Sequence, residues 1–309
     1  MILKIGTRGS KLALAQSRWV KEEVEARHSH VQVELVRIRT KGDKIIDSPL
    51  SKLGGKGLFV KEIEDALLRR QVHVAVHSMK DVPSELPGEL TLSVFPCRED
   101  PSDALISEED RTLEELPRGA RVGTSSLRRA AQLLHIRPDL EVVALRGNVD
   151  TRLKKLDSGD LHAIILATAG LKRLGFAHRI SEILPIECIL PAIGQGALGL
   201  ELRRDDEETL DLLEFLNHEP TQKTVTCERA FLKELEGGCQ VPIAGFARID
   251  EKSLHLRGLV AELDGSTLIR DEITGENEKA EEIGIALAKR LLDSGADKIL
   301  ERVYGRCDS

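Results

Sequence analysis

The stretch RVGTSSLRRAAQLLHIRPDLEVVALRGNVDTRLKKLDSGDLHAIIL, residues 121–166, decides the fold. The spacing of its apolar residues predicts, in order, a strand at 121–123, a helix at 127–136, a strand at 141–145, a helix at 149–156 and a strand at 163–166. Strands that alternate with helices are typical of a mostly parallel sheet with helices packed on it. The chain therefore contains an α/β domain.

The same alternation occupies the first hundred residues. It predicts strands at 3–6, 31–39 and 72–76, and helices at 11–27 and 58–70. Residues 96–101 hold two prolines and break the pattern, and residues 199–202 form one more strand-like segment. We expect that strand to return to the first lobe, so that two chain crossings form a hinge between two α/β lobes.

Beyond about residue 219 the pattern changes. It predicts a helix at 225–234, short alternating strands at 243–249, 254–262 and 267–273, and a long amphipathic helix at 278–294. These elements indicate an α+β module with its own core. For the 309-residue chain we expect domain 1 at 1–98 and 197–216, domain 2 at 99–196 and domain 3 at 217–309.

The composition disfavours several classes of function. The net charge is −7 and aromatic residues make up 3% of the chain, which disfavours a nucleic-acid surface of basic patches and stacking rings. The cysteines at 97, 188, 227, 239 and 307 are widely spaced, so neither a disulfide framework nor a metal site is expected. Without a membrane-spanning stretch or a signal-peptide pattern, we expect a cytoplasmic protein.

Basic residues gather at the ends of predicted strands. Arg128 and Arg129 follow Gly123, Thr124 and two serines at a strand-to-helix junction, where helix N–H groups and guanidiniums favour an anion. Further cations follow in the same setting, Arg146, Arg152, Lys172 and Arg173, and the first lobe adds Lys4, Arg8, Lys56 and Lys80. Because strand ends of an open α/β sheet face one crevice, we expect a ligand with many carboxylates or phosphates.

Two other residues are candidates for chemistry. Asp81, in a segment that follows the strand at 72–76, is placed either to stabilise developing positive charge or merely to shape the turn before Pro83. Cys239 follows two glycines and is either a presented thiol or a small buried residue. The glycines around Lys56 predict a lid over residues 43–57.

Two motif matches are rejected. GQGALG at 194–199 fits a dinucleotide-binding pattern but is followed by a strand-like segment, where that motif requires a helix. GGKG at 54–57 lacks the spacing and the hydroxyl residue of a nucleotide P-loop.

Six motifs taken together resemble the porphobilinogen deaminase family, also called hydroxymethylbilane synthases. They are KIGTRGSKLA at 4–13, GGKGLF at 54–59, HSMKDVP at 77–83, GTSSLRR at 123–129, LRGNV at 145–149 and EGGCQVP at 236–242. Lys4 stands where many family members have arginine, which keeps the charge but loses bidentate carboxylate binding.

The resemblance implies two lobes like those of periplasmic binding proteins and a small third domain. It also implies a transferase that joins four porphobilinogen molecules head to tail, with loss of ammonia, on a dipyrromethane cofactor held by a thioether at Cys239. Asp81 would stabilise the electron-poor azafulvene that loss of ammonia leaves. The rival hypothesis is a two-lobed polyanion-binding protein without catalysis.

The resemblance also assigns site residues. Cofactor contacts would come from Cys239, Lys80, Asp81, Ser126, Arg128, Arg129 and Arg146. Substrate contacts would come from Arg8, Ser10, Gln16, Lys56, Phe59, Arg146, Arg152 and Arg173. We expect a monomer with porphobilinogen as its small-molecule partner.

Overall fold

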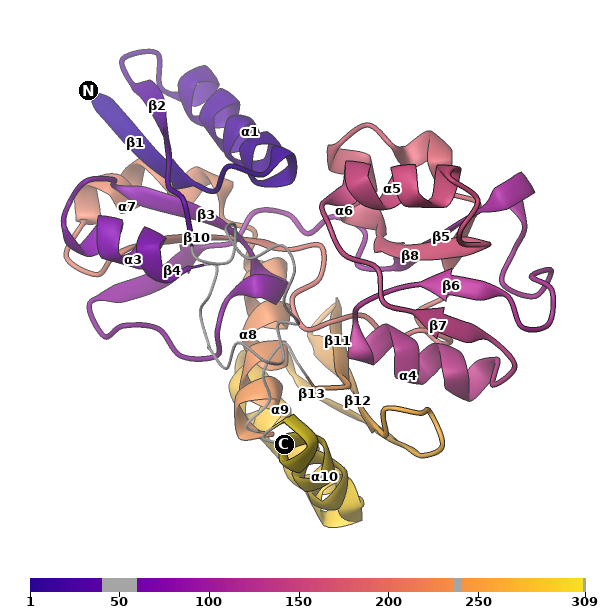
Figure 1. Ribbon diagram of the computed structural model, residues 1–309. Helices are drawn as coiled ribbons and strands as arrows, with labels where there is room; N and C mark the ends of the chain where they lie inside the picture. The colour runs from indigo at the N-terminus through magenta and orange to yellow at the C-terminus, as the bar shows by residue number, and fades with distance from the viewer. Residues whose placement is uncertain (41–59, 236–240, 308–309) are drawn as a thin grey trace.

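The protein has two α/β lobes and a third module that packs against both (Figure 1). The structure, a computed structural model, describes residues 1–40, 60–235 and 241–307. In the described residues, two sheets have five strands and one has three. The predicted fold class, α/β with a smaller α+β domain, is confirmed.

The first lobe is built on a sheet with the order β2-β1-β3-β10-β4. Its strands are β1 (Ile2–Thr7), β2 (Gln32–Arg37), β3 (Val74–Ser78), β4 (Leu90–Val94) and β10 (Leu198–Arg203). Its helices are α1 (Lys11–Arg27), α3 (Lys61–Leu68) and α7 (Glu207–Leu213). Separate apolar clusters pack α1 and α7 on one face of the sheet and α3 on the other.

The second lobe repeats this arrangement with the order β7-β6-β8-β5-β9. Its strands are β5 (Asp103–Ser107), β6 (Arg121–Gly123), β7 (Glu141–Val143), β8 (Ala163–Ala167) and β9 (Glu182–Leu184). Its helices are α4 (Leu127–Ile136), α5 (Val149–Asp157) and α6 (Thr168–Arg173). Leu133 of α4 packs on one face of the sheet, and Leu153 of α5 packs on the other.

Both sheets are mixed, whereas the alternation of elements predicts mostly parallel ones. β10 runs antiparallel to β3 and β4, and β5 runs antiparallel to β8 and β9. The reason is that β5 and β10 enter their sheets from the other lobe. The chain leaves the first sheet after β4 and comes back to it at β10. Two segments, 95–102 and 185–197, therefore connect the lobes, and together they are called the hinge.

The third module packs helices on one face of an antiparallel sheet with the order β11-β12-β13. Its elements are α8 (Glu219–Glu234), β11 (Ile243–Asp250), β12 (Ser253–Ala261), β13 (Leu268–Glu276), α9 (Ala280–Leu291) and α10 (Asp297–Cys307). Phe231 of α8 is fully buried against Gly245 and Gly258, where a Cβ atom would approach its ring to 3.3 and 2.6 Å. These glycines let the helix lie close to the sheet.

The helices of this module differ from the prediction at two ends. α8 begins six residues before the expected Val225, because Pro220 lies in the first turn of the helix, where its missing N–H costs nothing. His218 caps that turn by accepting a hydrogen bond from Thr221 N. The predicted helix at 278–294 ends near Gly295, whose φ of 100° interrupts it, and α10 follows.

Candidate functional site

The candidate site begins where β6 of the second lobe gives way to α4. Ser126 is the N-cap of α4, and its side chain accepts a hydrogen bond from Arg129 N at 3.4 Å. Arg128 and Arg129 therefore lie in the first turn of the helix, and both are about 5% exposed. This local geometry brings two guanidiniums into the interior side by side.

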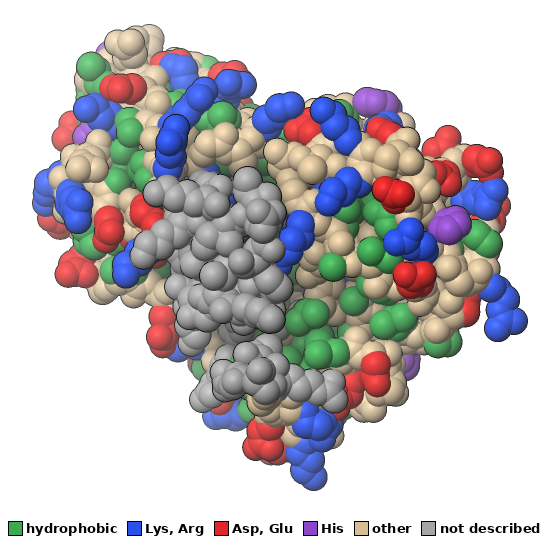
Figure 2. All heavy atoms as spheres, in the orientation of Figure 1, with side chains coloured by type: hydrophobic (Ala, Val, Ile, Leu, Met, Phe, Trp, Pro, Cys, Tyr) green, Lys and Arg blue, Asp and Glu red, His purple; other side chains and the backbone are tan. Residues whose placement is uncertain are grey.

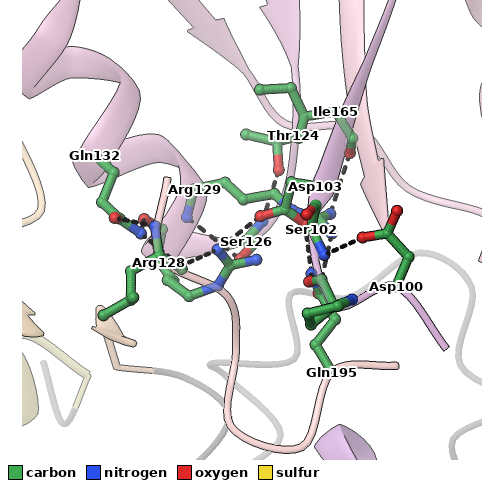
Figure 3. Close-up of polar contacts among 12 residues, drawn as sticks. Asp100, Ser102, Asp103, Thr124, Ser126, Arg128, Arg129, Gln132, Ile165 and Gln195 are labelled. Atoms are coloured by element: carbon green, nitrogen blue, oxygen red, sulfur yellow. Dashed lines mark hydrogen bonds and ion pairs between the residues drawn. The ribbon is translucent and has the colours of Figure 1, made fainter. Parts of the chain in front are cut away.

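Asp103, the first residue of β5, holds the two guanidiniums together (Figure 3). Its Oδ2 accepts a hydrogen bond from Arg128 Nη1 at 2.7 Å, and its Oδ1 accepts from Arg129 Nε at 3.0 Å and Arg129 Nη2 at 2.6 Å. Burial by itself would raise the pKa of Asp103, but the charges of Arg128 and Arg129 lower it below its usual range. The carboxylate is thus a fixed anion between two cations.

Gln195 joins this cluster to the hinge. Its side-chain nitrogen donates to Asp103 Oδ1 at 2.9 Å and to the carbonyl oxygen of Pro101 at 2.6 Å. Its backbone carbonyl accepts a hydrogen bond from Arg98 Nε at 2.8 Å. Both hinge segments therefore contact the buried ion cluster.

One carboxylate leaves this arginine pair electropositive. Arg128 Nη1 also donates to the carbonyl oxygen of Leu190, yet the buried Arg128 Nε has no hydrogen-bond partner among the described residues. Burial lowers the pKa of Arg128, with Arg129 acting in the same direction. An additional acceptor, such as a ligand carboxylate, would satisfy this site.

The first lobe contributes Lys80 and Asp81 from the short 3-10 turn that ends β3. Burial lowers the pKa of Lys80 to about 8, Asp81 and Asp103 oppose this, and Arg128 and Arg129 add to it. The charge of Lys80, in the first lobe, therefore interacts with the charges of Arg128 and Arg129 in the second. Asp81 itself is exposed.

Arg146 and Arg152 extend the cationic region along the second lobe. Arg152, on α5, donates from Nε to the carbonyl oxygen of Gly147 at 2.8 Å. Burial lowers the pKa of Arg152 to about 10, and the charges of Arg129 and Arg146 add to the effect, while Asp81 opposes it. Asp81 of the first lobe therefore lies close enough to Arg152 of the second for their charges to interact.

Other predicted residues lie at the edges of this region. Arg173 donates to the carbonyl oxygen of Gly196 at 2.8 Å, which places it against the hinge. Ser10 is the N-cap of α1 and accepts a hydrogen bond from Ala13 N at 3.2 Å, so its oxygen has a structural use. Gln16 is a buried residue of α1, and Arg8 follows β1. Lys56, Phe59, Cys239 and the predicted lid at 43–57 lie outside the described residues.

Asp103 and Gln195 were not recognised as site residues in the sequence. The available signal for Asp103 is its place as a single acidic residue at the start of the apolar run Asp-Ala-Leu-Ile. A carboxylate that is buried with such a strand needs a cation as its partner. Gln195 lies inside the rejected GQGALG motif, whose glycines allow close chain packing. At Gly196, with φ +87°, an added Cβ would meet the carbonyl oxygen of Glu99 at 2.3 Å.

On the face shown in Figure 2, Lys and Arg side chains border the junction between the two lobes. In the described part of the chain, no group of three or more His, Cys, Asp and Glu residues is placed to hold a metal ion. The same described residues include no helix long and apolar enough to cross a bilayer.

Comparison with known proteins identifies the family. The sequence profile described as "Porphobilinogen deaminase, dipyromethane cofactor binding domain" matches residues 3–211, and "Porphobilinogen deaminase, C-terminal domain" matches residues 222–293. The chain belongs to the porphobilinogen deaminase family. The resemblance predicted from the six motifs is confirmed, and with it a domain that binds a dipyrromethane cofactor.

Relatives within the porphobilinogen deaminase family match almost end to end. The porphobilinogen deaminase of Geobacter metallireducens is 55% identical over 98% of this chain and 95% of its own length. That of Trichlorobacter lovleyi is 56% identical over 98% of this chain and 97% of its own. Among solved structures, a TRAP periplasmic solute binding protein from Desulfovibrio salexigens has 15% identity and a TM-score of 0.42, over 70% of this chain and 71% of its own.

The residues of the site fit the cofactor of this porphobilinogen deaminase family. A dipyrromethane built from porphobilinogen has two pyrrole rings that each carry carboxylates. Three cations, the half-buried Lys80 and the buried Arg128 and Arg129, supply charge for such groups. Arg128 Nε, which has no partner among the described residues, supplies a further donor. The arrangement can therefore hold a polycarboxylate with one carboxylate, Asp81, kept among the cations.

Proposed function

We propose that this protein is a hydroxymethylbilane synthase, which joins four porphobilinogen molecules head to tail into a linear tetrapyrrole with release of ammonia. One observation carries the proposal: a carboxylate, Asp81, directly follows Lys80 on the turn that ends β3, and so lies among the cations of the site. A site for anion binding alone has no need of a carboxylate in that place, because it would repel the ligand.

The basic residues bind and orient the acidic rings. Lys80, Arg128, Arg129 and Arg146 would hold the cofactor, with the hydroxyl hydrogen of Ser126 as a further donor. Arg8, Ser10, Gln16, Lys56, Arg152 and Arg173 would hold the substrate and the growing chain, and Phe59 would pack against a ring. Guanidinium groups suit this task because they bind carboxylates bidentately and keep their charge when buried.

Asp81 is the residue to which we assign the chemistry. As ammonia leaves a pyrrole, positive charge develops on the ring, and a fixed carboxylate stabilises that charge and can accept a hydrogen bond from the pyrrole N–H.

Cys239 is the residue to which we assign the covalent attachment. It lies outside the described residues, but the buried Leu235 and Val241, which precede and follow it in the sequence, pack into the core of the third module. When bound, the dipyrromethane supplies the pyrrole carbon to which the first substrate is joined. A thioether suits an attachment that must last through many turnovers, because cysteine is nucleophilic and the product bond is stable.

We further propose the division into domains at residues 98/99, 196/197 and 216/217. Near the first two of these points the chain passes from one sheet to the other, between β4 and β5 and between β9 and β10. A monomer in the cytoplasm is proposed as well. Cys97 and Cys188 are exposed free thiols, as expected in a reducing compartment.

Intact-protein mass spectrometry tests the attachment. The wild-type protein should exceed its sequence mass by two linked pyrrole units, and Cys239→Ala should lack this addition. Cys188→Ala, a matched exposed cysteine, should keep it. The bare sequence mass in an active wild-type preparation would refute the attachment.

Turnover separates the enzyme from a polyanion-binding protein. Asp81→Asn should keep the added mass but lower kcat by roughly 100-fold or more, because the charge that stabilises the transition state is lost. Wild-type turnover in Asp81→Asn would refute the role of the carboxylate, and tight binding without ammonia release in the wild type would favour the rival hypothesis.

A further inference from the structure

The turn that carries Asp81 has little hydrogen bonding of its own on the side after the carboxylate. Within the described residues, the turn closes with a bond from Val82 N to the carbonyl oxygen of Met79 at 3.3 Å. The next residue, Pro83, has no N–H to donate. The position of Asp81 therefore depends on contacts that other parts of the chain make to this segment.

Those contacts come from Arg229, on α8 of the third module. Its Nη2 donates to the carbonyl oxygens of Pro83 at 2.8 Å and Ser84 at 3.2 Å, and its Nη1 lies 3.4 Å from that of Val82. One guanidinium thus binds three consecutive carbonyl groups directly after Asp81. A planar group with five N–H donors can do this, whereas an ammonium group is a compact point charge.

The neighbours of Arg229 fix the place of the helix. Glu228 binds the hinge through Arg98 and accepts a hydrogen bond from Gly194 N at 2.7 Å. One turn earlier on α8, the buried Val225 belongs to the same apolar cluster as Met79 and Val82, which flank Lys80 and Asp81. The helix is therefore anchored to the hinge and to the Asp81 turn at once.

Buried charge behind the turn supports the guanidinium. Burial lowers the pKa of Arg229, and the negative charge of Glu201 opposes this. Glu201 is 1% exposed and pairs with His77 Nε2 at 2.8 Å, so its carboxylate is held on β10 beside β3. Arg229 thus has an acidic neighbour that favours the charged form, which donates to the three carbonyls.

We infer that Arg229 is a positioning residue for catalysis, through which the third module holds the Asp81 turn in its reactive place. The inference rests on the proposed role of Asp81 and adds a residue outside the cationic site. It also gives α8 a function, because this helix carries the contacts to the hinge and ends shortly before Cys239 in the sequence. Docking of the third module and the placement of Asp81 are then one event.

The test compares full-length variants that carry the cofactor. Arg229→Met keeps the apolar stem but loses the donors, and we expect kcat to fall about 10- to 100-fold, as for a catalytic group displaced by about an ångström. KM should change less than about twofold, because Arg229 binds no substrate. Arg229→Lys should recover part of the loss. Lys233→Met, one turn further on α8 and 62% exposed, is the control and should keep wild-type kcat.

A double-mutant cycle distinguishes positioning from general stability. If Arg229 acts through Asp81, Arg229→Met should change the residual kcat of Asp81→Asn by less than about twofold. An equal loss in both backgrounds, or normal kcat in Arg229→Met, would overturn the inference. Wild-type turnover in Asp81→Asn would instead refute the proposed function. Should Arg229→Met not fold, Arg229→Lys decides, and full wild-type kcat in that variant counts against positioning.

Discussion

The contact between the third module and the hinge predicts a large effect for Glu228→Gln. Glu228 is fully buried, and its carboxylate accepts bonds from Arg98 Nη1 at 2.6 Å, Arg98 Nη2 at 3.2 Å, Gly194 N at 2.7 Å and Ala247 N at 2.8 Å. A glutamine has nearly the same shape, but its amide nitrogen cannot accept, so the donors at one oxygen lose their partner. The Arg98 guanidinium also loses its countercharge while 10% exposed.

The expected cost follows from this burial. Removing one partner of a buried ion pair costs about 3–5 kcal/mol, because the remaining charge stays desolvated. With a urea slope of about 2 kcal/mol per M, the midpoint for the third module should fall by roughly 2 M. The perturbation acts on the domain contact, so we expect the third module to separate or unfold before the two lobes do.

Two spectroscopic probes distinguish these events. Trp19 is the sole tryptophan and lies on α1, so its fluorescence follows the first lobe, whereas far-UV circular dichroism follows the whole chain. In Glu228→Gln the dichroism transition should begin well below the fluorescence transition. Glu234→Gln, on the same helix with an ion pair of 3.8 Å to Lys289, should shift the midpoint very little. Coincident, wild-type-like transitions in Glu228→Gln would refute the reasoning.

Two further predictions concern the cationic site. Lys80 is charged below about pH 8 and neutral above it, because burial lowers its pKa to about 8 from the usual 10.5. Since Lys80 is assigned to the cofactor, assembly of the cofactor on the free protein should weaken above that pH, and intact-protein mass spectrometry should then show less added mass. Lys80→Arg should not show this pH dependence. In the protein without cofactor, Lys80 binds its proton more tightly in the unfolded state than in the folded state. The contribution of Lys80 to the free energy of unfolding should therefore increase between about pH 8 and 10.5, which urea titrations at several pH values can measure. Arg129→Leu leaves Asp103 with fewer partners, so mass spectrometry should show loss of the added mass of the cofactor, and urea denaturation should show a loss of about 3–5 kcal/mol of stability. The control Arg121→Leu, at a 43% exposed arginine, should keep both. Full cofactor occupancy in Arg129→Leu would contradict the assignment.

Local sequence was enough to predict most of the elements of the two lobes. The helices at 11–27 and 127–136 have the expected bounds, because Ser10 and Ser126 cap their first turns through contacts only three residues away. The strand at 121–123 was likewise predicted from its own apolar residues. Signals of this kind depend only on residues a few positions apart, so they can be recognised without knowing the rest of the structure.

Several elements gave no such signal. β4, β5 and β9 are short strands whose place depends on neighbours far along the chain, and α10 is separated from α9 by the positive φ of Gly295. The antiparallel direction of β5 and β10 also depends on which lobe the chain comes from. Only the pairing of strands fixes it.

The sequence by itself determined the α/β alternation, the cationic strand ends, the candidate Asp81 and the family through its ordered motifs. The tertiary structure alone decided that Asp103 lies between Arg128 and Arg129, that Gln195 ties this cluster to the hinge, and that Arg229 binds the Asp81 turn from 145 to 147 residues away. The physical reason is that a buried charge needs a partner of opposite charge, but many residues of the chain could provide it. Which residue does so depends on the contacts between distant segments that form only in the folded chain.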